Sequence, residues 1–151
     1  MATDAITGQP IFKGSTAVGL RNVGSYQISG HPYMTGALIV GGLEHKVSFP
    51  YITKKITVTL SGTVDVGKGN VRITFVPTGS DNMVTGRYHY AFLDSHEDSQ
   101  DFDVKCKEIY ISSPAGATLS SGASFFVYAS LTSIPTSSMY ALTGSGINSA
   151  T

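Results

Sequence analysis

Apolar and polar residues alternate along much of this chain with a period of two. In residues 54–60, Ile56, Val58 and Leu60 alternate with lysine and threonine. Side chains on a β-strand point alternately to opposite faces, so this pattern predicts a strand that is buried on one side only. We therefore expect the three aliphatic side chains to face the core.

A second segment with the same period follows after a glycine-rich interval. Residues 71–77 place Val71, Ile73 and Phe75 on one face, and residues 67–70 between the two segments read GKGN. Glycine and asparagine tolerate the positive φ angles of tight hairpin turns. We therefore expect the two segments to pair as a hairpin.

Short apolar segments bounded by turn residues recur over most of the remaining chain, and no stretch has the 3.6-residue period of an amphipathic helix. The further expected strands are residues 24–29, 38–40, 46–49, 88–93, 101–106, 108–112, 124–131 and 139–142. About nine or ten strands without intervening helices predict an all-β antiparallel sandwich, with a jelly roll as the favoured topology. A small closed barrel is the alternative that the pattern leaves open.

The length of 151 residues suits one domain, and no linker or internal repeat divides the chain. We therefore treat residues 1–151 as a single sandwich domain. Residues 1–20 and 143–151 are rich in small residues, and we expect these ends to be flexible or to become ordered on a partner.

The charge balance argues against several classes of partner. Ten lysines and arginines balance ten aspartates and glutamates, so there is no positive surplus to attract nucleic acid. The longest apolar run, residues 124–131, is far shorter than the roughly 20 residues of a membrane-spanning helix. The start of the chain lacks the features of a secretory signal, so we expect synthesis in the cytoplasm and no membrane association.

The densest group of ionisable residues is residues 94–103, DSHEDSQDFD, where His96 stands among acidic residues. Carboxylates can bind calcium, but the spacing lacks the glycine and closing glutamate of a calcium loop. We therefore expect a solvated hairpin loop, with a cation site as the lesser alternative.

No catalytic motif or zinc spacing accompanies the scattered histidines, His31, His45, His89 and His96. The single cysteine, Cys106, follows Phe102 and Val104 at spacing two, so we expect a buried, unreactive thiol. These residues predict no enzyme, no cofactor and no metal site.

Eight tyrosines and no tryptophan make up an unusual aromatic inventory. Tyrosine combines an apolar ring with a polar hydroxyl, which suits both protein interfaces and platforms for sugars. The absence of tryptophan makes a sugar-binding module the less favoured of the two.

Four segments resemble blocks of small virion proteins from marine tailed phages, including cyanophages. They are residues 22–36 (NVGSYQISGHPYMTG), 47–54 (VSFPYITK), 104–112 (VKCKEIYIS) and 138–147 (SMYALTGSGI). The resemblance extends over about residues 19–147. It implies a structural protein of the phage particle, without catalytic residues, and favours a capsid decoration or cement protein.

The resemblance leads to specific expectations about partners and location. The protein would assemble in the host cytoplasm, bind the major capsid protein on the outside of the virion and stabilise the shell as a homo-oligomer, with a trimer as first expectation. The residues expected at its interfaces are Tyr26, Tyr33, Met34, Met139 and Tyr140. The alternative is a tail, fibre or baseplate module that recognises glycans on the host surface.

Overall fold

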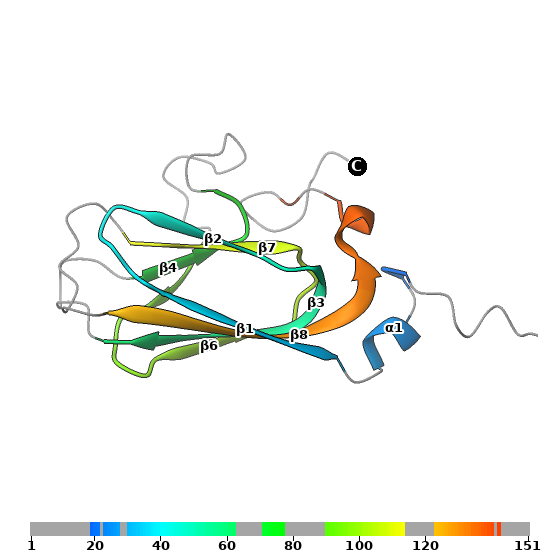
Figure 1. The fold of residues 1–151 in the computed structure, drawn as a ribbon, viewed down its shortest axis with the longest axis horizontal. Helices are drawn as coiled ribbons and strands as arrows, with labels where there is room; N and C mark the ends of the chain where they lie inside the picture. The colour runs from blue at the N-terminus through cyan, green and yellow to red at the C-terminus, as the bar shows by residue number, and fades with distance from the viewer. Residues whose placement is uncertain are drawn as a thin grey trace, which may run out of the picture.

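Two antiparallel four-stranded sheets pack face to face in the computed structural model (Figure 1). The structure describes residues 19–21, 23–27, 30–62, 71–77, 90–113, 123–140 and 142. The predicted all-β sandwich is therefore confirmed, and the strands of this described part do not close into a barrel.

Each sheet is formed by strands from distant parts of the chain. The first sheet contains, in spatial order, β1 (His31–Leu38), β8 (Ser124–Pro135), β3 (Tyr51–Ser61) and β6 (Ser99–Phe102). The second sheet contains, in spatial order, β2 (Glu44–Ser48), β7 (Glu108–Ser112), β4 (Val71–Thr74) and β5 (Ala91–Leu93).

The pairing of these strands has the connectivity of a jelly roll. β1 pairs with β8, β2 with β7, β3 with β6, and β4 with β5, all antiparallel. The described chain is thus one long hairpin, folded over so that β3 also pairs with β8 and β4 with β7. Eight strands wrapped in this way match the predicted jelly-roll topology, with eight strands in the described residues in place of nine or ten.

The inner face predicted for residues 54–60 is confirmed, because Ile56, Val58 and Leu60 of β3 are all fully buried. The predicted hairpin with residues 71–77 is wrong, because β3 and β4 belong to opposite sheets. Their apolar faces meet across the core instead of lying side by side. The expected turn at residues 67–70 lies outside the described residues.

Two expected strands near the ends are also wrong. Residues 24–29 contain a short helix, α1 (Gly24–Gln27), in which the N–H groups of Tyr26 and Gln27 donate to the carbonyl of Val23. Residues 139–142 follow a 3-10 helix, η1 (Thr136–Ser138), and their described members are not part of a strand.

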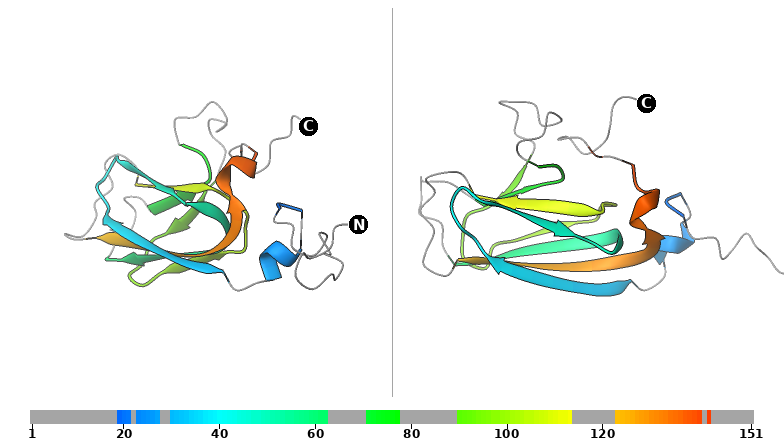
Figure 2. Two further views of the ribbon diagram at one scale, coloured as in Figure 1. Left: turned by 45° about the vertical axis from the view of Figure 1, so that its right-hand side comes forward. Right: turned by 45° about the horizontal axis from the view of Figure 1, so that its top comes forward.

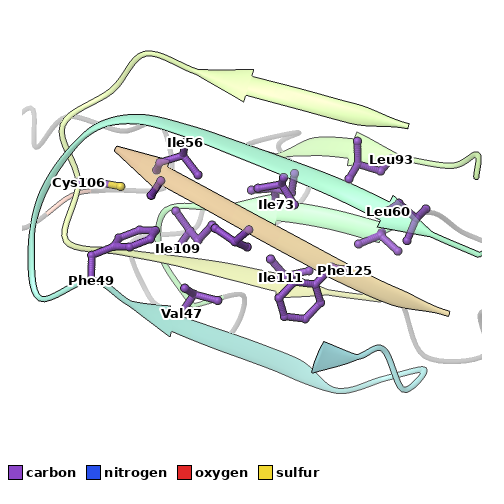
Figure 3. Packing of buried hydrophobic residues seen from close by; sticks show 14 of the residues in the cluster. Val47, Phe49, Ile56, Leu60, Ile73, Leu93, Cys106, Ile109, Ile111 and Phe125 are labelled. Carbon is purple, nitrogen blue, oxygen red and sulfur yellow. The ribbon is translucent and has the colours of Figure 1, made fainter. Parts of the chain in front are cut away.

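Aliphatic and aromatic side chains from both sheets fill the space between them (Figure 3). Phe125 of β8 is the largest fully buried side chain, and Ile73 and Ile111 reach the same core from the second sheet. A smaller cluster lies where α1 and η1 meet one end of the sandwich (Figure 2). There Ile52 and Ile134 are buried together with Met139.

Candidate interaction surface

A stripe of exposed apolar side chains runs along β1 and β8 on the outer face of the first sheet. Met34 and Leu38 of β1 are 76% and 62% exposed, and Phe126 and Tyr128 of β8 are 54% and 45% exposed. The register places Met34 opposite Tyr128, so side chains of the two strands are neighbours on this face. We call these four residues the β1–β8 stripe. Contiguous exposed apolar groups of this kind mark interaction sites.

Gly36 allows the stripe to be continuous. It lies opposite Phe126 in the ladder between β1 and β8. A methyl group at this position would come within 2.7 Å of the carbonyl oxygen of Phe125 and 3.0 Å of the Phe126 ring. The absence of a side chain at Gly36 therefore lets the ring of Phe126 lie across the neighbouring strand.

Polar side chains border the stripe on β3 and β6. The ammonium group of Lys55 lies 2.9 Å from a carboxylate oxygen of Asp101, and the hydroxyl of Thr57 donates to the other carboxylate oxygen. The hydrogen bonds from Lys55 and Thr57 lower the pKa of Asp101, and the bond to Asp101 raises the pKa of Lys55. The outer face of the first sheet thus changes from apolar at the β1 edge to polar and ionic at the β6 edge.

The outer face of the second sheet is organised differently. Lys46 of β2 forms an ion pair with Glu108 of β7 at 2.7 Å, and the hydroxyl of Tyr110 donates to the same carboxylate at 2.9 Å. Partial burial alone would raise the pKa of Glu108, but the hydrogen bonds from Lys46 and Tyr110 hold that pKa below its usual value. Phe92, at the β5 edge of this sheet, is an exposed apolar residue.

The five residues expected at interfaces do not form one surface. Met34 belongs to the stripe, and Tyr140 is 51% exposed beyond η1. Tyr33 is half-buried, and its ring packs edge-on against Phe49. Tyr26 and Met139 contact the small cluster at the end of the sandwich, where Met139 is buried. Within the single chain, Met34 and Tyr140 therefore have the most accessible side chains of the five.

A cation–π contact helps to attach the segment before β1 to the body of the domain. The ammonium group of Lys105 lies 4.4 Å from the centre of the Tyr26 ring and donates to the carbonyl oxygen of Leu20 at 2.8 Å. The hydroxyl of Tyr26 donates to the same carbonyl at 3.1 Å. Tyr26 thus has a structural role within the chain that its sequence context did not indicate.

The acidic segment 94–103 is not the hairpin loop that was expected. Residues 94–98 lead from β5 in the second sheet to β6 in the first, and residues 99–102 form β6 itself, so the segment connects the two layers. Its backbone is tied to the end of β3, because the N–H of Leu60 donates to Asp98 and the N–H of Glu97 donates to Leu60. The ring of His96 accepts a hydrogen bond from the N–H of Gly62. Among the described residues, no group of three or more histidine, cysteine or acidic side chains could hold a metal ion.

Cys106 is buried, as predicted, at one end of the core (Figure 3). Desolvation raises the pKa of its thiol to about 11, so the reactive thiolate is scarce at neutral pH. The hydroxyl of Thr53 accepts a hydrogen bond from the N–H of Cys106 at 3.0 Å and donates to the carbonyl of Val104 at 2.7 Å. These contacts give Cys106 and Thr53 a role in joining β3 to the chain that leads into β7.

The expected histidines occupy separate places. His31 lies beside the ring of Tyr51, and His45 faces Phe125 with a ring nitrogen that has no hydrogen-bond partner. His89 lies outside the described residues.

One sequence signal for the stripe was available in residues 124–131, SFFVYASL, where apolar residues occupy both alternating sets of positions. Such a strand has an apolar outer face as well as an apolar inner face. Leu38, Phe126 and Tyr128 were nevertheless not among the residues expected at an interface.

No protein-family model matches this chain, and no curated protein matches it. In the part of the chain that the structure describes, no helix is long and apolar enough to cross a membrane. The case for a function therefore depends on the geometry above and on the sequence resemblance.

Proposed function

We propose that this protein is a decoration, or cement, protein of a tailed-phage capsid. In this role it binds the outer lattice of the major capsid protein through the β1–β8 stripe, bridges neighbouring subunits and stabilises the shell. Its location would be the exterior of the virion, after assembly in the host cytoplasm.

The observation that carries the proposal is the contrast between the two outer faces of the sandwich. One face presents Met34, Leu38, Phe126 and Tyr128, whereas on the other face Lys46, Glu108 and Tyr110 hydrogen-bond to each other. A protein that sits on a preformed shell needs an exposed face that can dock, and the apolar side chains of the β1–β8 stripe supply one. Burial of aromatic and aliphatic side chains at the centre of an interface supplies most of its binding energy.

The fold is compatible with this role, and the sequence resemblance favours it. Jelly rolls occur in viral capsid proteins and in lectins, so the topology alone does not select a function. The four sequence segments that resemble marine phage virion proteins favour the capsid. Each copy needs only modest affinity, because a symmetric lattice that engages an oligomer at several sites increases the overall binding strength.

The test is to add the purified protein to capsid shells that lack it, and to locate any added density by electron cryomicroscopy. We expect density on the icosahedral faces or at local symmetry axes, with the first sheet turned toward the shell. Changing Phe126 and Tyr128 together to serine should weaken binding at least tenfold, since each is an exposed aromatic residue of the stripe. Phe92→Ser, on the edge of the other sheet, is the matched control and should bind like the unmodified protein.

A tail module that binds host glycans is the second candidate, because the exposed rings of Phe126 and Tyr128 could stack on sugars. This candidate predicts that added protein leaves the shells bare, is located at the tail of intact particles and is retained on a glycan array. These three results together would support the tail module and exclude the decoration role. Equal loss of shell binding in the Phe92 control would contradict docking through the stripe.

A further inference from the structure

The four edge strands of the sandwich differ in how they are protected against pairing with another strand. β5 has three residues and β6 has four, and β2 carries Glu44 and Lys46. Short length and charge are the usual ways in which proteins prevent edge-to-edge association. β1 has eight residues, HPYMTGAL, without lysine, arginine, aspartate or glutamate. Among the described edges, β1 is therefore the long and uncharged one.

The direction of the backbone groups on β1 follows from the ladder. The N–H of Ile39 donates to the carbonyl of Ala123 at 2.9 Å, which continues the pairing of β1 with β8. Backbone groups alternate in direction along a strand, so odd-numbered residues of β1 bond to β8 and even-numbered residues point to the open edge. Met34, Gly36 and Leu38 therefore offer both N–H and C=O groups at this edge. Pro32 also points there, which is where a strand tolerates the missing N–H of proline.

We propose that β1 pairs in antiparallel orientation with β1 of a second copy, about a two-fold axis at Gly36. In this register Gly36 pairs with itself, and Met34 pairs with Leu38 of the other copy. All three outward N–H groups then find a carbonyl acceptor, and Pro32 remains beyond the paired residues. Moving the axis toward Pro32 would place a proline opposite Gly36 or Leu38 and would lose hydrogen bonds.

Side chains and charge favour a second copy as the occupant of this edge. The pairing joins the two first sheets into one eight-stranded sheet, on whose outer face the two β1–β8 stripes meet. Met34 of one copy lies beside Leu38 of the other, and the paired strands carry no charged groups of like sign that would repel each other. The formal net charge of zero adds no long-range repulsion between copies. A two-fold contact closes at two subunits, so this inference gives a dimer in place of the expected trimer.

This inference goes beyond the proposed function and can be tested without shells. Sedimentation of the full chain over a hundredfold range of concentration should show a monomer–dimer equilibrium. Residue-resolved amide hydrogen exchange should show protection of Met34, Gly36 and Leu38 that increases with the dimer fraction. The amides of Tyr33, Thr35 and Ala37 should be protected at every concentration, because they bond to β8. A monomer at all concentrations, or a dimer whose even-numbered amides exchange freely, would overturn the inference.

A charge at the edge provides a second test. Met34→Lys puts a charge beside Leu38 of the other copy in place of an apolar contact and should raise the dimer dissociation constant at least tenfold. Phe92→Lys puts the same change on an exposed apolar residue of β5 and should leave the dissociation constant unchanged. Equal effects of the two variants would contradict pairing through β1.

Engineered cysteines test the register. A mixture of Met34→Cys and Leu38→Cys proteins should form a mixed disulfide faster than either protein cross-links to itself, because these positions face each other across the axis. The native Cys106 is buried and does not compete. Faster self-cross-linking of Met34→Cys would exclude the axis at Gly36.

Shell binding separates this inference from the proposed function. A monomer that still decorates shells leaves the proposed function in place and overturns the dimer. A dimer that does not bind shells supports the pairing through β1 and overturns the proposed function. If the even-numbered amides of a monomer become protected only when shells are added, a strand of the shell protein occupies the edge, and the second copy is excluded.

Discussion

The two outer faces of this sandwich are built on the same alternating pattern but carry different side chains. On the first sheet the outward positions of β1 and β8 include methionine, leucine, phenylalanine and tyrosine side chains that are exposed. On the second sheet the outward positions of β2 and β7 include Lys46, Glu108 and Tyr110, whose polar groups satisfy each other. Most inward positions of both sheets are apolar, as the core requires, although His45 of β2 also faces inward against Phe125. The difference lies in the residues that do not fill the core: they leave exposed apolar side chains on the first sheet and form an ion pair with a hydrogen-bonded tyrosine on the second.

The largest expected effect on stability distinguishes the inner side from the outer side of one strand, β8. Phe125 is fully buried and Phe126, the next residue, is exposed. Phe125→Ala should lower the free energy of unfolding by about 3–5 kcal/mol because it leaves a cavity in the core. Phe126→Ala should change it by less than about 1 kcal/mol. Denaturant unfolding of the two variants measures both values, and similar losses would mean that the outer ring also contributes to the fold.

A smaller effect is expected where the stripe depends on close approach of two strands. Gly36→Ala should destabilise the fold by about 1–3 kcal/mol, because the added methyl meets the carbonyl of Phe125 and the ring of Phe126. Adding Phe126→Ala should restore only part of the stability, since the carbonyl contact remains. Gly19→Ala, which has nothing within 4 Å, is the control and should be nearly neutral in thermal unfolding.

The smallest effect concerns the polar face. The pKa of Glu108 is below its usual value in the folded protein, so its contribution to stability is complete above the unfolded pKa and is lost as the pH falls through the folded pKa. Lys46 is half-exposed, and solvent screening keeps the contribution of the pair small.

Glu108→Gln should therefore lower stability slightly at neutral pH and should weaken its decline below about pH 4.5, the ordinary value for glutamate. Urea unfolding between pH 3 and pH 7 measures this difference. Glu97→Gln, a change at a glutamate whose side chain is 84% exposed, controls for the loss of one charge. An identical pH dependence in Glu108→Gln and the unmodified protein would exclude a role for the ion pair.

The alternation in the sequence predicted which faces of the strands are buried better than it predicted which strands lie next to each other. The inward set Ile56, Val58 and Leu60 follows directly from a period of two. The same pattern cannot say whether two consecutive strands lie beside each other or face each other across the core. The segments 54–60 and 71–77 face each other, although the short interval between them had suggested a hairpin.

The ends of the domain show why local pattern was insufficient there. Tyr26 was expected to lie on a strand, but hydrogen bonds to the carbonyl of Val23 form one helical turn, and Lys105 packs on the Tyr26 ring. The contact with Lys105 depends on where that distant residue lies, which no local pattern records. Of the residues expected at an interface, Met34 is in the stripe. Residues 124–131 were expected to form a strand, but their apolar outer positions were not considered.

The central position of β8 has a consequence for how the protein is made. β8 is the last strand of the described chain, and it lies between β1, the first strand, and β3. The first sheet can be completed only after β8 has left the ribosome, so β1 lacks its neighbour in the sheet during most of synthesis. Contacts between such distant segments form slowly, and unpaired strand edges are prone to aggregate in the meantime. A nascent chain that stops before residue 124 should thus remain dependent on chaperones, however complete its other strands are.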